Sequence, residues 1–211
     1  MNIRNVQLET GSSATAYQKV TLTSDVTESG KRDCYGVLFD GSDDSFITAS
    51  LDFSSTDKMT VMSAVRKLSD AARGTVAELT ATAASNNGAF HLTAPNAASA
   101  TYAFESKGTT LTDAVASSQT APLPSVLTGQ GDISGDTTTL RVNGVQADSD
   151  TGDQGSGNYA NSALYFGRRG NSSLPYNGYE FCTIIRGATT DSAVISNFER
   201  NYLARRAGIS I

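Results

Sequence analysis

The stretch that decides the fold is residues 137–170, TTTLRVNGVQADSDTGDQGSGNYANSALYFGRRG. Asn143-Gly144 is the dipeptide best suited to a two-residue type I′ turn, because both central positions of that turn need a positive φ. The flanking residues alternate in polarity, so the predicted hairpin has one apolar side and one wet side. The expected pairs are Val142 with Val145, Leu140 with Ala147 and Arg141 with Gln146.

The alternation resumes in ALYFGRRG, where Leu164 and Phe166 share one face. Working outward, residues 58–68 predict a central strand, residues 75–82, 89–95 and 101–108 predict a meander, and residues 177–187 predict a strand that is apolar on both faces. Residues 68–73 suggest one helical turn, and the low periodicity of residues 111–128 indicates a connecting loop with two prolines. The pattern indicates an all-β protein of two packed sheets.

The period changes near the end of the chain, where an amphipathic helix is predicted. Asp191 is placed to cap its start, and Gly208 is placed to end it. The apolar stripe consists of Val194, Ile195, Phe198, Tyr202 and Leu203.

Composition excludes several classes of protein. With 16 basic and 21 acidic residues the formal net charge is −5, so no diffuse basic field attracts nucleic acid. No apolar run approaches the ~20 residues of a membrane span, and no signal peptide follows Met1. Two cysteines, Cys34 and Cys182, are too few for a disulfide framework, and free thiols are favoured over a disulfide. Cys182 is expected in the core.

The first 34 residues read differently from the rest of the chain. Residues 1–20 predict one strand and a linker, and residues 21–34 predict a further polar linker. VQLETGSSATAYQ resembles the last strand and exit of carbohydrate-binding jelly-roll modules in bacteriophage tail proteins. That resemblance implies that residues 1–20 are the end of an upstream module.

Several blocks in order then resemble a known family. FDGSDD (39–44), VMSAVRK (61–67), LRVNGV (140–145), LYFGR (164–168) and the Asn177-Gly178 pair are similar to the landmarks of concanavalin A-like domains of the laminin-G type. TDKMTVMSAVRKLSDAARG, TGQGDISGD and DQGSGN are similar to the versions found in bacteriophage and prophage tail or virion proteins. The resemblance covers residues 35–211.

The resemblance implies a two-sheet antiparallel jelly-roll sandwich with a C-terminal α-helix. Such domains serve as lectins, adhesion modules, glycosidases and architectural units, so the fold alone does not fix an activity. It also implies a location in the virion, after synthesis in the bacterial cytoplasm.

No catalytic residue is predicted. Retaining glucanases of this superfamily carry Glu-x-Asp-x-Glu along one strand, whereas Glu78, Glu105 and Glu180 each stand singly in their strands and are expected on a solvated face. His91 is the only histidine and is interpreted as structural, since no triad partner is suggested.

Calcium is a possible cofactor, because many relatives hold it at one rim of the sandwich and hard cations need clustered oxygen ligands. Two acidic clusters qualify, although both also fit ordinary turn chemistry, which is favoured. They are Asp148, Asp150 and Asp153, with Asp40, Asp43 and Asp44 as the alternative.

Sugar binding needs an aromatic platform with planar hydrogen-bonding groups around it. The competing interpretation is that Tyr165 covers the sheet while the arginines pair with carboxylates, and the absence of Trp weakens the glycan site. The candidate residues are Tyr102, Tyr159, Tyr165, Arg168, Arg169, Asn171, Tyr176 and Tyr179.

The sequence thus leads to a first hypothesis: a non-enzymatic carbohydrate-binding or adhesion module of a bacteriophage tail or fibre protein that recognises bacterial surface polysaccharide. The alternative is an architectural virion domain that contacts other virion subunits, as a homotrimer, without a glycan ligand. A glycoside hydrolase is the third and weakest hypothesis, because the acid pair is missing.

Overall fold

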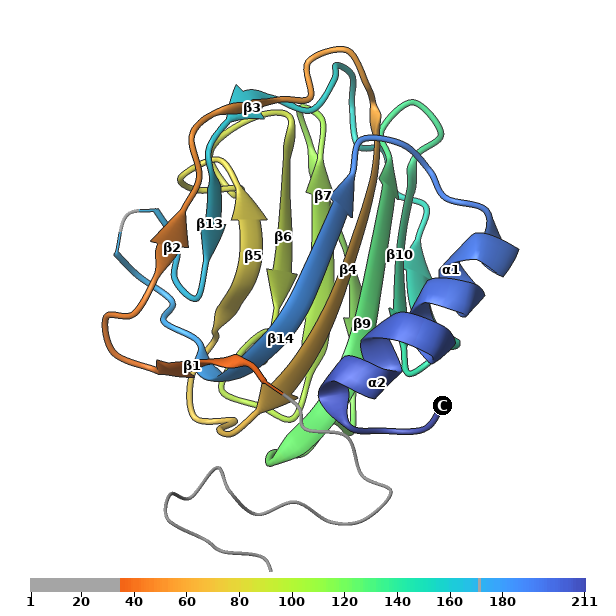
Figure 1. The fold of residues 1–211 in the computed structure, drawn as a ribbon. Coiled ribbons are helices and arrows are strands. Elements are labelled where there is room, and N and C mark those ends of the chain that lie inside the picture. The colour runs from red at the N-terminus through yellow and green to blue at the C-terminus, as the bar shows by residue number, and fades with distance from the viewer. Residues whose placement is uncertain (1–34, 171) are drawn as a thin grey trace, which may run out of the picture. The chain divides into compact units, whose positions relative to one another are not determined.

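The computed structural model describes residues 35–170 and 172–211, which contain two six-stranded sheets (Figure 1). In spatial order, sheet A consists of β1 (Val37–Asp40), β14 (Asn177–Arg186), β4 (Lys58–Lys67), β9 (Leu123–Asp132), β10 (Thr137–Val142) and β11 (Val145–Asp150). Sheet B consists of β2 (Phe46–Ile47), β13 (Leu164–Phe166), β5 (Thr75–Leu79), β6 (Ala89–Thr93), β7 (Tyr102–Lys107) and β8 (Leu111–Ala116). A short pair joins β12 (Asn161–Ser162) to β3 (Leu51–Asp52). Every pairing is antiparallel, which confirms the predicted sandwich. The predictions for residues 1–34, including Cys34, lie outside the described residues.

The hairpin of β10 and β11 forms as predicted around its turn. Asn143 and Gly144 have φ values of +51° and +83°, as a type I′ turn requires. Val142 pairs with Val145, but the register shifts before Leu140, which lies opposite Asp148 instead of Ala147. Because of a bulge in β11, the predicted pair of Leu140 with Ala147 was wrong, whereas the other two predicted pairs form.

The core lies between the sheets, and β4 shows how the sequence divides its side chains. Met59, Val61 and Val65 face the inter-sheet core. Met62 and Ala64 face the other way, into a second cluster under the C-terminal helix. Alternating side chains thus serve the two faces of one strand, and both β4 and β14 are interior strands of sheet A, as the central strand predicted over residues 58–68 requires for β4.

Two local predictions were wrong. Residues 68–73 form bends without a helical turn, and residues 111–128 are not a loop throughout, because they include β8 and the start of β9. β8 escaped notice because its inward positions are small or polar, namely Thr112, Ala114 and Ala116. Pro124 is tolerated because β10 pairs only with residues 127–132 of β9, which leaves one side of this segment without a strand.

The C-terminal helix consists of α1 (Ser192–Phe198), a π-helical turn η2 (Glu199–Leu203) and α2 (Ala204–Ala207), and it covers the outer face of sheet A (Figure 1). Asp191 caps its start by accepting a hydrogen bond from the Ala193 amide at 2.8 Å, and Gly208 ends it with a φ of +69°. The packed stripe differs from the predicted one.

The buried positions of this helix are Ile195, Glu199, Leu203, Ala204 and Ala207, whereas Val194, Phe198 and Tyr202 are exposed. Glu199 is accommodated because Arg141 donates to both of its oxygens at 3.0 Å and Thr128 donates to Oε1 at 2.8 Å. Within the described residues, no helix is long and apolar enough to cross a membrane.

Candidate functional site on the outer face of sheet B

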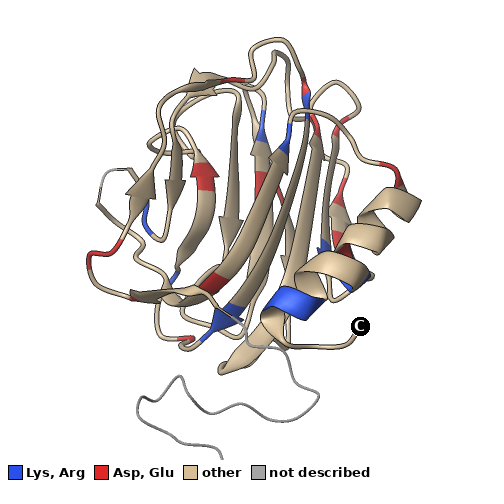
Figure 2. Ribbon diagram, viewed as in Figure 1, with Lys and Arg blue, Asp and Glu red and all other residues tan. Residues whose placement is uncertain are grey.

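A row of polar side chains crosses the outer face of sheet B. Strand register places Tyr165 opposite Glu78, Glu78 opposite His91, His91 opposite Glu105, and Glu105 opposite Asp113. Their strand neighbours fill the inter-sheet core, so the alternation turns this row outward. Figure 2 shows acidic segments on β5 and β7, the two strands that flank β6 in this sheet. These five residues are called the charged row below.

Two arginines from separate loops lie over the row. The Nε of Arg169, which follows β13, donates to the two carboxylate oxygens of Glu78 at 3.1 and 3.0 Å. Arg73, which precedes β5, donates to Glu105 through Nη2. The Nη2 atoms of both arginines lie 3.2 Å from Nδ1 of His91, so the two guanidinium groups meet at one imidazole nitrogen.

Burial and charge act in opposite directions in this network. Burial would raise the pKa of Glu105, but the hydrogen bond from His91 and the charges of His91 and Arg73 lower it overall, so the carboxylate stays ionised. The pKa of Asp113 is raised, first by burial and then by neighbouring acids, including Glu105. Within the described residues, Nε of Arg73 is shielded from solvent and has no hydrogen-bond partner.

Solvent reaches the edges of this network more than its centre. Glu78 and His91 are fully buried, whereas the side chain of Arg73 is 27% exposed. Tyr165 is half-buried and packs against Gly170, where an added Cβ would lie 2.7 Å from the tyrosine ring. Arg168 is also partly exposed. The arrangement offers an aromatic ring with planar donors and carboxylate acceptors beside it.

The structure brings together only part of the predicted glycan site. Tyr165, Arg168 and Arg169 lie on or directly after β13, and Asn171 is outside the described residues. Tyr179 lies on sheet A, where its ring stacks on Phe181 with centroids 6.1 Å apart. It borders a separate cavity of about 550 Å³ next to α2.

Three predicted platform residues are corrected, because they belong to the inter-sheet core. Tyr102, Tyr159 and Tyr176 are at most 1% exposed. Tyr102 and Tyr159 share hydrogen bonds with the hydroxyls of Ser125 and Ser106, at 3.0 and 2.7 Å. Their rings have no exposed face for a sugar, and a buried tyrosine with a hydroxyl partner explains each of these two positions without a ligand.

Five of the six carboxylates in the two acidic clusters accept hydrogen bonds from backbone amides. In the first predicted calcium cluster, Asp148 accepts from the Val115 amide at 2.7 Å, Asp150 from the Gly152 amide at 2.7 Å and Asp153 from the Gly155 amide at 2.6 Å. In the second cluster, Asp40 and Asp44 bind backbone amides of the same turn, and Asp43 is exposed. Across residues 35–170 and 172–211, no three His, Cys, Asp or Glu side chains are grouped to hold a metal ion, and calcium at either cluster stays a prediction.

Comparison with known proteins shows that the fold of this chain also occurs in other proteins. No protein-family model matches the chain, and no curated protein matches it. Solved structures do match. The carbohydrate-binding module CBM40 of the Ruminococcus gnavus IT-sialidase, bound to α2,3-sialyllactose, is 12% identical with a TM-score of 0.56, over 78% of this chain and 95% of that one.

A heptameric SAP-like pentraxin from Limulus polyphemus is 11% identical with a TM-score of 0.62, over 82% of this chain and 86% of that one. Domains LG4-5 of the mouse laminin α1 chain are 14% identical with a TM-score of 0.56, over 74% of this chain and 44% of that one. The fold is a concanavalin A-like jelly roll. At identities this low, the similarity to these solved structures shows a shared fold and does not show a shared function.

Sequence reasoning missed the charged row as a unit. Glu78, His91 and Glu105 occupy outward positions of three consecutive strands, TVAELTAT, AFHLTAP and TYAFESKG. Aligning these strands as a meander in register would have placed the three side chains side by side. The two covering arginines come from loops 96 residues apart in sequence, 73 and 169, and no local signal joins them.

Proposed function

We propose that this jelly roll is a non-enzymatic carbohydrate-binding or adhesion module of a bacteriophage tail or fibre protein. It recognises bacterial surface polysaccharide through the exposed end of the charged row. The place in the virion rests on the sequence resemblance to phage tail and virion proteins.

One observation carries the proposal: Tyr165 is partly exposed and lies opposite Glu78, whose carboxylate is held by Arg169, and the partly exposed Arg168 directly precedes that arginine in the chain. An aromatic ring stacks on the apolar face of a pyranose, and planar donors and acceptors bind its hydroxyls. The side chain of Arg73 is 27% exposed, so part of this planar group is open to solvent at the edge of the charged row. A CBM40 module of similar fold is known with sialyllactose bound, which makes acidic glycans the first class to try.

A glycan array that carries sialylated oligosaccharides and bacterial capsular and lipopolysaccharide glycans tests the proposal. Tyr165→Ala and Arg168→Ala are each expected to weaken binding about tenfold or more, because each removes a contact at the site. Tyr202→Ala and Arg200→Ala are matched controls, since they remove the same residue types from the exposed face of the helix on sheet A. Equal binding by all four variants would place the glycan elsewhere.

A second function is favoured by exposed apolar side chains at one side of the sandwich. Val37 and Leu38 on β1 and Phe46 and Ile47 on β2 are 45% to 62% exposed. Such a patch is typical of protein contacts, so the alternative is an architectural domain that assembles with virion subunits, as a trimer of this chain. If the protein binds no glycan on the array and forms a concentration-dependent trimer in light scattering, this alternative is favoured.

A further inference from the structure

An open cavity of about 300 Å³ lies between the two sheets, away from the charged row. Its walls come from β1 and β14 of sheet A and from β2 and β13 of sheet B. The wall residues that matter here are Val37, Phe39, Phe46, Phe166, Glu180 and Thr183. Phe39 and Phe46 meet edge to face with ring centroids 5.8 Å apart, so most of the wall is aromatic.

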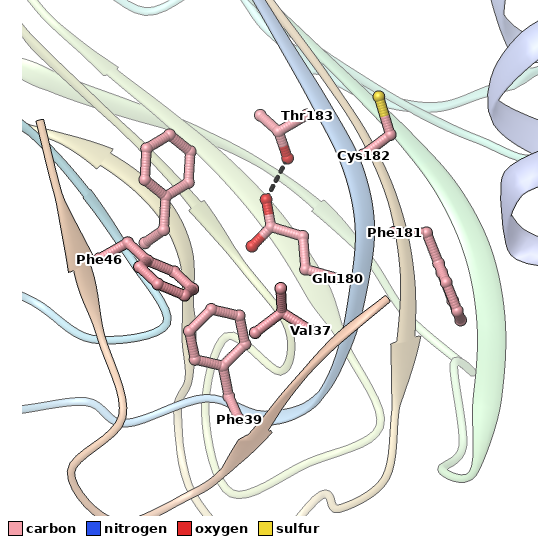
Figure 3. A pocket seen from close by; sticks show the side chains of 8 residues that line it. Val37, Phe39, Phe46, Glu180, Phe181, Cys182 and Thr183 are labelled. Carbon is pink, nitrogen blue, oxygen red and sulfur yellow. Dashed lines mark hydrogen bonds between the residues drawn. The ribbon is translucent and has the colours of Figure 1, made fainter. Parts of the chain in front are cut away.

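Glu180 places a carboxylate in this apolar setting. A bulge between Glu180 and Cys182 interrupts the alternation of β14. As a result, Glu180 and Thr183 point to the side of Phe39 and Phe46, while Phe181 and Cys182 point toward the helix (Figure 3).

Only one oxygen of this carboxylate has a partner. Thr183 donates to Oε1 of Glu180, and the Thr183 hydroxyl also lies 2.8 Å from the hydroxyl of Ser63. Oε2 is shielded from solvent and has no partner among the described residues, and no ion pair found in them includes Glu180. A shielded carboxylate oxygen that accepts no hydrogen bond lowers the stability of the folded protein, and a ligand that donates a hydrogen bond to it would remove this cost.

The surroundings make this group a weak acid. Burial raises the pKa of Glu180 to about 7, against the opposing effect of the Thr183 hydrogen bond. The ionisable groups that interact with it are Tyr176 and the Cys182 thiol, whose own pKa values are raised by burial, so both are neutral at pH 7. Neither supplies a positive charge.

We propose that this cavity binds a small primary ammonium ion carried on a compact apolar group. The ammonium would donate to Oε2 of Glu180, and a charge-assisted hydrogen bond of this kind is stronger than one between neutral groups. The faces of Phe39, Phe46 and Phe166 attract cations and cover the apolar body. An anion would be repelled by Glu180, and a purely apolar molecule would leave Oε2 without a partner.

The mouth of the cavity is accessible. Phe46 is 55% exposed and Val37 is 45% exposed. They lie on β1 and β2, which are the outermost strands of their sheets on this side (Figure 1). A cavity near 300 Å³ is at the small end of ligand sites, which suits a single six-membered ring with one amino group.

Calorimetric titration of the full chain with cyclohexylamine at about pH 8, beside cyclohexanol as a neutral probe of the same shape, tests the proposal. The amine is expected to bind, and cyclohexanol to bind at least about tenfold more weakly. Glu180→Gln should weaken the amine about tenfold or more, because the variant keeps the shape and removes the charge. Asp43→Asn removes one exposed carboxylate on the turn after β1 and should leave amine binding unchanged.

The pH dependence gives a second measure. An alkylammonium stays charged up to about pH 10, so affinity should rise between about pH 6 and 8 as Glu180 ionises, and this rise should vanish in Glu180→Gln. Amide chemical shifts around Thr183 should move on binding and report the location. Equal affinity for amine and alcohol, equal amine affinity in wild type and Glu180→Gln, or shifts confined to another region would each overturn the proposal.

Discussion

Glu180 is expected to make the stability of the domain depend on pH. Its pKa is raised by burial from 4.5 to about 7, so between these values the folded form keeps a proton that the unfolded form has lost. Stability is therefore full below pH 4.5 and falls as the pH rises through 7. Compared with Glu180→Gln, the wild type should lose up to about 3 kcal/mol between about pH 4 and pH 8, as urea unfolding at both pH values can measure. A constant difference between the two proteins would contradict this prediction.

Arg169 and Arg168 are adjacent in the chain, but removing their charges is expected to reduce the stability of the domain by very different amounts. Arg169→Met leaves the fully buried carboxylate of Glu78 with the Ala83 amide as its one remaining close donor, and should cost about 3–5 kcal/mol. Arg168→Met makes the same change in charge at a partly exposed side chain and should cost less than about 1 kcal/mol. Chemical denaturation of both variants measures the difference. Similar costs would show that the charged row does not depend on the guanidinium of Arg169.

At the scale of elements, the turn between β10 and β11 also joins the hairpin to β9. Asn143 donates its amide to the Val126 carbonyl and accepts the Val126 amide on Oδ1, both at 2.8 Å. Asn143→Ala loses this acceptor and places alanine at positive φ, so it should cost about 2–3 kcal/mol. Asn143→Asp keeps the acceptor and tolerates positive φ, and it should cost less than about 1 kcal/mol in the same denaturation experiment. Equal costs would show that neither the Oδ1 acceptor nor the tolerance of positive φ explains the role of Asn143.

Most elements could be predicted because they follow period 2, as β4 and β13 do. The errors have identifiable physical causes. β8 presents Thr112, Ala114 and Ala116 inward, so it has no hydrophobic contrast to detect. In the helix, the sequence suggested Phe198 and Tyr202 as packed, but Glu199 is buried instead because Arg141, which lies 58 residues earlier, pairs with it. A pairing of this kind depends on tertiary structure, and no helical pattern contains it.

At the scale of the whole molecule, the apolar patch of β1 and β2 predicts how the chain associates. If it is a subunit contact, Ile47→Ser should abolish any oligomer in light scattering, because it places a hydroxyl in the contact. Val145→Ser is the control, since Val145 is 68% exposed on β11 at the opposite edge of sheet A. An oligomer that survives Ile47→Ser would show that the patch is not the contact.

The candidate site was harder to predict than the fold, because most of its residues are far apart in the sequence. Tyr165, Arg168 and Arg169 are close in sequence and were found together. The rest of the site joins four more strands and a loop, and Arg73 reaches Glu105 across 32 positions. Tyr102, Tyr159 and Tyr176 were wrongly grouped with them. Tyr102 lies on a strand whose covered face the sequence does not show, and the connecting segments of Tyr159 and Tyr176 are folded into the core by tertiary contacts.

The strand order of sheet A has a consequence for how the chain matures. β14 is the last strand in sequence, yet it lies between β1 and β4. In sheet B, by contrast, β5, β6, β7 and β8 lie side by side in the order in which they follow along the chain. During synthesis, the meander can therefore form early, and β4 can pair with β9 once residues 123–132 have emerged, but β1 must wait until residues 177–186 have left the ribosome. The whole of β1 and the edge of β4 that pairs with β14 therefore lack their strand partner for most of translation, so a stalled or truncated chain would present them to chaperones and proteases.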